Sequence, residues 1–333
     1  MKKDSDKNIL VTGGAGYIGS HTCKKLVENG YFPIIYDNFS TGNKWAVKWG
    51  YLEEGDILDL EKLINIIRKH KPSVVIHLAA KAYIGESINY PEKYFRNNVV
   101  GSINLLEAMK KTNTTKIVFS SSCATYGIPK DLPILESEDQ VPISPYGTSK
   151  HVIEQIINSY SQSDNLNFIN LRYFNAAGAD LDCEIGEFHD PEPHLIPSIF
   201  EALLKNKEFV INGSDYRTYD GTCIRDFIHV EDLANAHVKS IDNLLKSRKN
   251  FSFNLGTGRG YSILEVIKEV EKITNRTLKI KISERRVGDP PKLFASGRLA
   301  KKELGWDPSH SDLNEILKTA WNWYLKINST YIF

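Results

Sequence analysis

The sequence predicts an α/β protein, with a doubly wound parallel sheet and a smaller C-terminal lobe. Three observations lead to this prediction. Strand-like apolar runs alternate with helix-like segments in the first half, a glycine-rich turn follows the first run, and runs such as 72–80 show no polar/apolar alternation. Repeated strand–helix units give a parallel sheet with helices on both faces, and strands buried on both faces are apolar throughout.

The first half of the chain contains the elements of this sheet. Segment 17–30 is expected to be a helix that ends at Gly30, because glycine is common just after a helix C-terminus. The predicted strands are 8–14, 32–38, 72–80, 116–122 and 168–175, and the predicted helices are 17–30, 59–71, 92–111 and 147–163. Residues 1–176 are therefore assigned to one nucleotide-binding domain of the Rossmann type.

The pattern loosens after residue 176. The stretch "GADLDCEIGEFHDPEPHLIP" is rich in glycine, proline and acidic residues and is expected to be a loop. Helices are predicted at 196–206, 231–247 and 262–275, and a further core strand at 251–257. We assign 177–333 mainly to a smaller lobe, with about 226–258 returning to the first domain.

Composition and charge exclude several classes of protein. The 333 residues are 41% hydrophobic, and 42 basic residues balance 41 acidic ones, which gives a net charge of +1. This balance gives no electrostatic reason to expect a nucleic acid or a membrane as partner. No run approaches the ~20 apolar residues of a membrane-spanning helix, and the charged start lacks the apolar stretch of a signal peptide. The four widely spaced cysteines are expected to be reduced thiols, so we predict a cytoplasmic protein.

The glycine-rich turn "VTGGAGYIG" predicts a dinucleotide site. Gly13, Gly16 and Gly19 follow a strand and open a helix, which lets the backbone approach a pyrophosphate at the helix N-terminus. Asp37 lies at the end of the second strand, where a carboxylate binds a ribose 2′-hydroxyl and repels a 2′-phosphate. The sequence therefore favours NAD over NADP. An ordinary tight turn, and a loop-capping role for Asp37, are the less favoured interpretations.

Tyr146 and Lys150 in "SPYGTSK" form a candidate catalytic pair. Residues four apart lie on the same side of a helix, and a nearby cation favours the phenolate over the phenol. Ser122 ends the fourth predicted strand, at the edge of the sheet where ligands of such folds bind. A tyrosine–lysine pair alone is more often structural. After a dinucleotide loop and a strand-ending serine, we interpret the three residues as an acid–base site.

The motifs and their order resemble the extended short-chain dehydrogenase/reductases and, more closely, the UDP-glucose 4-epimerases. The resemblance runs from about residue 8 to about residue 325. It rests on "ILVTGGAGYIGSHT", "YDNFSTG", "HLAAKAYIGES", "FSSSCATYG", "SPYGTSK", "LRYFNAAGA", "GTCIRDFIHVEDLA" and "RRVGDPP".

The resemblance implies roles for individual residues. Besides the three glycines, it places Tyr17 and Ile18 at the pyrophosphate, Asp37, Asn38 and the loop to Gly42 at the adenosine, Asp56 and Ile57 at the adenine, and Leu78, Ala79, Ala80, Asn97 and Phe174 along the cofactor. It implies catalytic roles for Ser122, Tyr146 and Lys150, with Lys150 also at the nicotinamide ribose. It implies UDP-sugar contacts for Tyr173, Asn175, His194, Leu195 and Asn212, and a diphosphate clamp formed by Arg225 and Arg286.

The implied reaction interconverts UDP-glucose and UDP-galactose, through a transient 4-keto sugar and enzyme-bound NADH, in a homodimer. Leu293, on the expected pocket wall, is intermediate in size, so N-acetylated or pentose UDP-sugars remain alternatives. A sugar-nucleotide dehydratase is less favoured, because Cys123 and Ala124 stand where an acid is needed. A non-catalytic NAD-binding regulator is disfavoured by the intact tyrosine–lysine pair.

Two further local patterns have competing interpretations. Paired arginines suit a diphosphate, but Arg225 and Arg286 each have an acidic neighbour, so surface salt bridges are the alternative. His189 and His194 in "FHDPEPH" suggest metal ligands. No Cys or His cluster with zinc-like spacing accompanies them, so we predict no metal.

Overall fold

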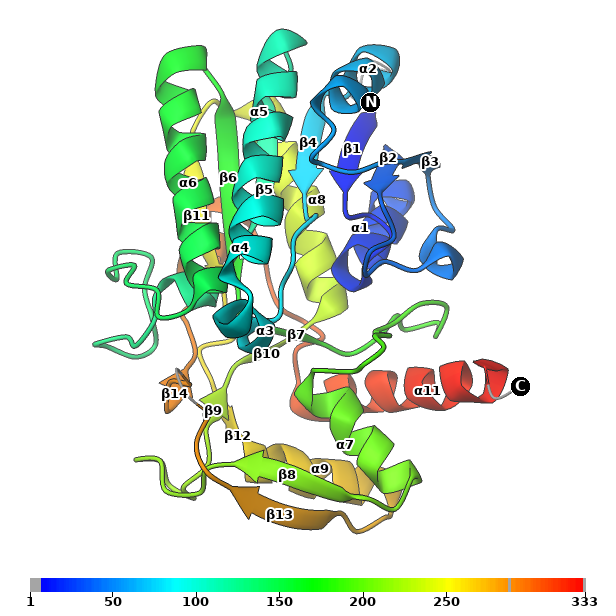
Figure 1. Cartoon of the computed structure of the whole chain (residues 1–333), viewed down its shortest axis with the longest axis vertical. Coiled ribbons are helices and arrows are strands. Elements are labelled where there is room, and N and C mark those ends of the chain that lie inside the picture. The colour runs from blue at the N-terminus through cyan, green and yellow to red at the C-terminus, as the bar shows by residue number, and fades with distance from the viewer. Residues whose placement is uncertain (1–6, 287–288, 332–333) are drawn as a thin grey trace.

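The central element of the computed structural model, which describes residues 7–286 and 289–331, is a seven-stranded parallel sheet (Figure 1). The strand order is β11-β6-β5-β4-β1-β2-β3. The strands are β1 (Asn8–Thr12), β2 (Phe32–Asp37), β3 (Tyr51–Glu54), β4 (Val74–His77), β5 (Lys116–Ser122), β6 (Asn167–Tyr173) and β11 (Phe251–Leu255). The predicted α/β class with a parallel sheet is confirmed.

Helices cover both faces of this sheet. On one face lie α2 (Leu60–His70), α5 (Gly101–Lys111) and α6 (Pro145–Asp164), and on the other lie α1 (Tyr17–Glu28) and α8 (Val230–Lys246). Along β1, Ile9 and Val11 pack on the α1/α8 side, whereas Leu10 packs on the α2/α5/α6 side. Both faces of the sheet are therefore buried under helices, which explains why polar and apolar residues do not alternate along the strands.

Several element boundaries differ from the prediction for local reasons. β1 ends at Thr12, because Gly13 takes a positive φ of 75° and turns the chain. The predicted helix 92–111 consists of α4 (Pro91–Tyr94), a π-helical turn (Phe95–Val100) and α5. The predicted strand 168–175 is divided into β6 and β7 (Asn175–Ala177). β7 pairs with β10 (Phe227–His229) outside the main sheet.

The remaining chain builds a second lobe, drawn below the main sheet in Figure 1. Its helices are α7 (Leu195–Leu204), α9 (Ile263–Thr274) and α11 (Leu313–Tyr331), and its strands are β8 (Glu208–Asn212), β9 (Ile224–Arg225), β12 (Tyr261–Ser262), β13 (Lys279–Ser283) and β14 (Lys292–Leu293). The three helices and β8 share one apolar core. The predicted loop 178–197 contains no helix or strand up to residue 194 apart from an isolated bridge, but its last three residues already belong to α7.

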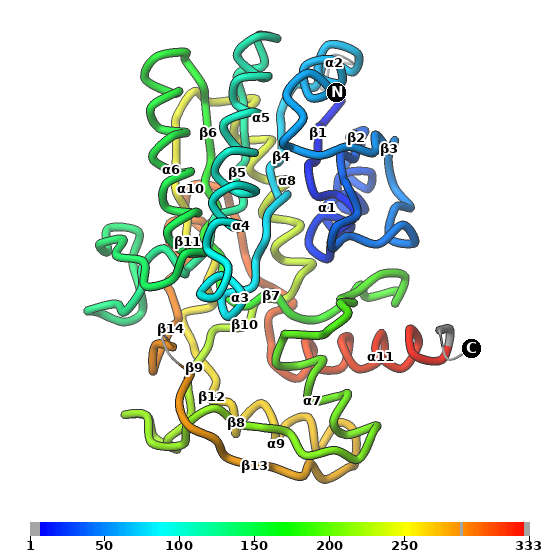
Figure 2. Tube along the Cα trace, in the orientation of Figure 1, coloured from blue at the N-terminus to red at the C-terminus, as the bar shows by residue number. Residues whose placement is uncertain are grey.

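The chain returns from the second lobe to the first sheet. α8 packs along α1, and β11 pairs in parallel with β6 at the edge of the seven-stranded sheet, as the trace in Figure 2 shows. α10 (Arg298–Leu304) also packs near β11 and α8. We propose a division at residue 176, with about 226–258 rejoining the first unit, as the arrangement of two folding units. None of the helices within 7–286 and 289–331 is long and apolar enough to cross a membrane.

Candidate active site

A cleft of about 1250 Å³ is lined by both the main sheet and the second lobe. β4, drawn in Figure 1 as an arrow, ends on the side that faces the second lobe. The cleft brings together nearly all residues that the sequence singled out: Gly13, Gly16, Tyr17, Ile18, Gly19, Asp37, Asn38, Gly42, Ile57, Leu78, Ala79, Ala80, Asn97, Ser122, Tyr146, Lys150, Tyr173, Phe174, Asn175, His194, Leu195, Asn212, Arg225, Arg286 and Leu293. Asp56 does not line it, but accepts a hydrogen bond of 2.8 Å from Asn38, which does.

The glycine turn forms a tight cradle at the start of α1. A Cβ added at Gly13 would lie 2.7 Å from the backbone nitrogen of Ala79, and one added at Gly19 would lie 2.1 Å from the carbonyl oxygen of Gly13. The N-cap residue of α1 is Gly16, which has no side chain to accept a hydrogen bond, so the first amide groups of the helix are not satisfied by a side chain and lie at the cleft. Uncapped amides with the positive end of the helix dipole fit a pyrophosphate.

Asp37 ends β2 beside this cradle. Its carboxylate accepts hydrogen bonds from the backbone amides of Ala15 (3.0 Å) and Phe39 (2.8 Å). Burial raises the pKa of Asp37, although these amides oppose the shift. The side chain is thus held in place at the cleft wall, and a carboxylate there fits the two hydroxyls of a ribose. The residues present therefore suit a dinucleotide without a 2′-phosphate, such as NAD.

The candidate catalytic residues come from β5 and the first turns of α6. Ser144 caps α6 by accepting a hydrogen bond from the Gly147 amide, and Pro145 follows at the first helical position. This start places Tyr146 and Lys150 on successive turns. The Lys150 ammonium nitrogen lies 5.9 Å from the centre of the Tyr146 ring and donates a 2.7 Å hydrogen bond to the Ser120 carbonyl. The side chain of Ser122, at the end of β5, interacts with the Tyr146 phenol in the direction that lowers the pKa of Tyr146.

Burial dominates the titration of this pair. Burial raises the pKa of Tyr146 to about 12, although the interaction with Ser122 opposes the shift. Burial also lowers the pKa of Lys150 to about 7, against the attraction of Glu154. The spacing of Tyr146 and Lys150 predicts that the lysine favours the phenolate. Among the protein's own residues, the pKa of Tyr146 is instead raised, because the cost of burying the phenolate charge is greater than the stabilisation that a partly protonated Lys150 provides.

A buried ion pair holds the catalytic helix against the sheet. Arg172 on β6 makes a two-point contact with Glu154 on α6, with Nε 2.9 Å and Nη2 2.5 Å from the two carboxylate oxygens. Its third nitrogen donates to Tyr126 at 2.8 Å. Both charged side chains are buried. Such a bidentate pair fixes orientation as well as distance, so α6 presents its first turns to the cleft in one register.

The second lobe brings both arginines to the cleft, in different environments. Arg225 on β9 is largely buried and pairs with Asp289. This contact joins two segments far apart in the sequence, and thus differs from the surface salt bridge that the sequence left open. Arg286 is exposed. Leu293 on β14 lies opposite Arg225 in the strand register and is buried at the cleft wall.

Other polar contacts fix the backbone around the cleft. The Tyr17 hydroxyl donates a 2.7 Å hydrogen bond to the Gly178 carbonyl, which links the start of α1 to the segment after β7. Asn175 donates at 2.9 Å to the Asp226 carbonyl, beside the β7–β10 pair. Tyr173 shares a short hydrogen bond with Ser120 between β6 and β5 of the main sheet. Of the three, the Tyr17 contact ties the dinucleotide cradle to the chain that leads into the second lobe.

The sequence reasoning missed several cleft residues. In the sequence, Asp289 is only an acidic neighbour of Arg286. Its ion pair with Arg225 depends on the fold. Glu187 and Glu192 line the cleft beside His194, and their carboxylates raise the pKa of His194 to about 10 although burial opposes this. The stretch "EFHDPEPH" carries this signal, because it contains two glutamates beside its two histidines, whereas zinc-like spacing considers cysteine and histidine alone.

Comparison with known proteins places the chain in a family. Residues 9–256 match the model of the NAD dependent epimerase/dehydratase family. The chain is 47% identical over 324 residues to a UDP-glucose 4-epimerase of Rhizobium meliloti (strain 1021), covering 97% of this chain and 98% of the relative. This chain belongs to the NAD dependent epimerase/dehydratase family.

Solved structures agree with this assignment. The crystal structure of UDP-glucose 4-epimerase from Brucella ovis in complex with NAD superposes with a TM-score of 0.93 at 50% identity, covering 96% of this chain and 98% of that one. The UDP-glucose 4-epimerase from Bifidobacterium longum in complex with NAD+ and UDP gives a TM-score of 0.93 at 37% identity, covering 97% and 100%. The predicted Rossmann-type fold is thereby confirmed.

Proposed function

We propose that this protein is an NAD-dependent UDP-glucose 4-epimerase, which interconverts UDP-glucose and UDP-galactose through a transient 4-keto sugar. The observation that carries the proposal is the single cleft that holds Tyr146, Ser122 and Lys150 between an uncapped glycine cradle and Arg225. The relative and the two solved structures described above, which share this chain's length and fold, are UDP-glucose 4-epimerases. The reaction belongs to galactose metabolism.

The residues divide the work of this reaction. Tyr146 takes the proton from the sugar 4-hydroxyl and later returns it, while the Ser122 hydroxyl bonds to the same oxygen. Bound NAD accepts a hydride from sugar carbon 4 and gives it back, and its positively charged ring favours the phenolate. Lys150 is held by the Ser120 carbonyl beneath the tyrosine ring, where a partly protonated amine lowers the cost of the phenolate.

The second lobe holds the substrate by its nucleotide end. Arg225 and Arg286 are proposed to bind the diphosphate, with Tyr173, Asn175, His194, Leu195 and Asn212 around the uridine and sugar. For Arg225, the diphosphate competes with Asp289 for the guanidinium. Anchoring at the diphosphate leaves the sugar free to present either face of carbon 4 to the cofactor, which an epimerase needs.

The test incubates the purified protein separately with UDP-glucose, UDP-N-acetylglucosamine and UDP-xylose, and follows each product by chromatography and NMR. We expect UDP-glucose to yield UDP-galactose without added NAD and without net NADH. Leu293 leaves room for a second candidate substrate class, the N-acetylated or pentose UDP-sugars, and the same panel ranks them. Loss of water from the sugar, or no conversion by NAD-loaded protein, would refute the proposed reaction.

A cytoplasmic location and a homodimeric state are part of this proposal. The balanced charge of +1 supports the absence of nucleic-acid and membrane partners. Sedimentation of the purified chain across a range of concentrations measures the oligomeric state directly.

A further inference from the structure

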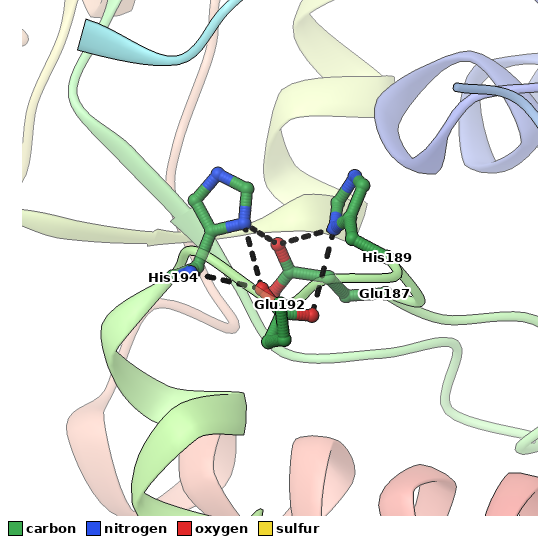
Figure 3. A group of neighbouring side chains, drawn as sticks. All are labelled: Glu187, His189, Glu192 and His194. Atoms are coloured by element: carbon green, nitrogen blue, oxygen red, sulfur yellow. Dashed lines mark hydrogen bonds and ion pairs between the residues drawn. The ribbon is translucent and has the colours of Figure 1, made fainter. Parts of the chain in front are cut away.

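Two glutamates and two histidines converge in the segment that leads into α7. Glu187, His189, Glu192 and His194, here called the acid–histidine cluster, offer donor atoms that all lie within 4.8 Å of one another (Figure 3). His194 Nδ1 lies 2.7 Å from Glu187 and 3.0 Å from Glu192. His189 Nδ1 lies 3.6 Å from a carboxylate oxygen of each glutamate. The two imidazoles therefore face the same pair of carboxylates.

Most side chains of this cluster are largely buried. The side chains of Glu187, Glu192 and His189 are 9%, 10% and 14% exposed, whereas that of His194 is 42% exposed. His189 Nδ1 is buried and has no hydrogen-bond partner, because 3.6 Å is too long for a hydrogen bond to either glutamate. A buried polar nitrogen that makes ion-pair contacts but no hydrogen bond needs an explanation. It is aimed at two carboxylates, so a cation between them would satisfy it.

We propose that the acid–histidine cluster binds a divalent first-row transition metal ion, with zinc as the favoured ion. Imidazole nitrogens and carboxylate oxygens are ligands of Zn²⁺, and four protein ligands complete a tetrahedral structural site. Metal–ligand bonds of about 2.1 Å set neighbouring donors about 3.4 Å apart in a tetrahedron. The four distances of 2.7, 3.0, 3.6 and 3.6 Å bracket that value. Small side-chain shifts complete the site.

The backbone around the cluster is anchored independently of any metal. The His194 amide donates to Glu192 Oε1 at 2.9 Å, which orients that carboxylate. The Trp323 indole on α11 donates to the Glu187 carbonyl at 2.9 Å, and Asn43 donates to the Phe188 carbonyl at 3.3 Å. The ligand-bearing segment is thus held by both halves of the molecule, and the ligands are brought together by the fold.

A second acidic group is neutralised by a lysine, whose ammonium group is not a metal ligand. Asp180, Asp182 and Glu184 also lie close together. The Lys24 ammonium reaches all three, at 2.7, 3.2 and 2.8 Å, and so supplies the cation from within the chain. In the acid–histidine cluster the carboxylates are paired with imidazoles, which can bind a metal through the same nitrogen atoms.

The proposed metal organises the cleft wall and takes no part in the proposed proton transfer. His194 is the residue before α7, so a metal bound there ties the segment 187–194 to the start of that helix. The proposal does not depend on the reaction assigned above, because it concerns binding of the ion to the chain itself. A protein that binds zinc but fails to convert UDP-glucose would refute only the proposed function.

The direct experiment titrates the chelator-treated full chain with zinc chloride by calorimetry, and with cobalt chloride by visible absorption. We expect one ion per chain, and intense cobalt bands typical of tetrahedral coordination. The double variant His189→Gln/Glu192→Gln removes two ligands while preserving side-chain size, and is expected to weaken zinc binding at least 100-fold. The single variant Glu192→Gln is measured beside it, and circular dichroism checks that each variant is folded.

The matched control is His310→Gln. His310 and Glu315 form an isolated histidine–glutamate pair at 2.7 Å, without further ligands. We expect this variant to bind zinc as the unaltered chain does. No zinc binding by the unaltered chain, or equal binding by the double variant, would overturn the proposal.

Discussion

The two sides of the cleft are specified in different ways. On the cofactor side, the glycine cradle and Asp37 lie on β1, α1 and β2, which are consecutive in the chain. On the sugar side, Arg225 lies on β9. The strands that pair with β9 are β12 and β14, which lie at least 36 residues further along the chain. Local sequence therefore determines the cofactor side, whereas long-range pairing assembles the sugar side. The catalytic helix α6 lies at the junction and is held by Arg172.

The largest expected effect tests that junction. Changing Tyr146 to phenylalanine removes the proposed acid–base group while keeping the ring, so we expect turnover to fall by roughly 10²–10⁴. The measurement is steady-state conversion of UDP-glucose. Tyr160→Phe makes the same change further along α6, away from the cleft lining, and should leave turnover nearly unchanged. Equal activity of the two variants would remove Tyr146 from the mechanism.

The free energy of unfolding should also fall strongly in acid, because of buried histidines in the part of the molecule that contains the main sheet. Burial lowers the pKa of His21 to about 4, of His77 to about 3 and of His237 to about 4, so the folded protein keeps these rings neutral. The unfolded chain protonates them near pH 6.5. The contribution of these neutral rings to the free energy of unfolding is fully present above pH 6.5. It is lost as the pH falls toward 4, by up to about 1.4 kcal/mol per pH unit for each histidine.

Urea unfolding at a series of pH values between 7 and 4 measures this slope. His77→Gln should reduce the slope of the unfolding free energy against pH by the contribution of one histidine, because glutamine does not titrate. The ring of His77 bonds to Thr12 and Ser102 at 2.7 and 2.8 Å, so the variant will also be less stable at pH 7. A slope that does not change in this variant would show that His77 is protonated in the folded state.

The contrast between the two sides explains what the sequence could predict. The parallel sheet, the glycine turn and the predicted helices α1, α2 and α6 follow from apolar periodicity and turn residues within short windows. The pairing of β8 with β13, and of β9 with β12 and β14, depends on contacts between segments far apart. These short strands have no pattern of their own, so the sequence did not reveal them.

Individual residues show the same limit. α11 was not predicted, although Leu313, Ile316, Leu317 and Ala320 recur at helical spacing and are buried. The candidate site residues other than Asp56 meet in one cleft, but most sugar-side roles came from resemblance and stay predictions. The tyrosine pKa could not be derived from spacing, because the sequence gives no measure of how deeply Tyr146 and Lys150 are buried.

A smaller effect is expected from a single methyl group in the cradle. Gly19→Ala places a Cβ 2.1 Å from the Gly13 carbonyl oxygen, so the turn must shift. Overpacking of this kind costs about 1–3 kcal/mol, and we expect NAD affinity to fall correspondingly, as measured by calorimetry. Gly85→Ala is the control, because a Cβ there meets no atom within 4 Å. Unchanged NAD affinity in Gly19→Ala would show that the cradle does not touch the dinucleotide.

The smallest effects compare one helix cap on each side of the cleft. Asp59 is exposed and caps α2, accepting from the Lys62 amide at 3.0 Å, so Asp59→Ala should cost about 1 kcal/mol. Ser262 caps α9 within a capping box, is fully buried and also bonds to Asp220, a contact across 42 residues. Ser262→Ala removes the cap and also the hydroxyl bound to Asp220 Oδ2, while Asp220 Oδ1 keeps the amide and hydroxyl of Thr222. The cost should therefore exceed that of a cap alone and approach about 2 kcal/mol. Urea unfolding measures both changes. A greater loss from Asp59→Ala would contradict the view that the sugar side depends more on long-range contacts, since the purely local cap would then matter more than the cap that joins two distant segments.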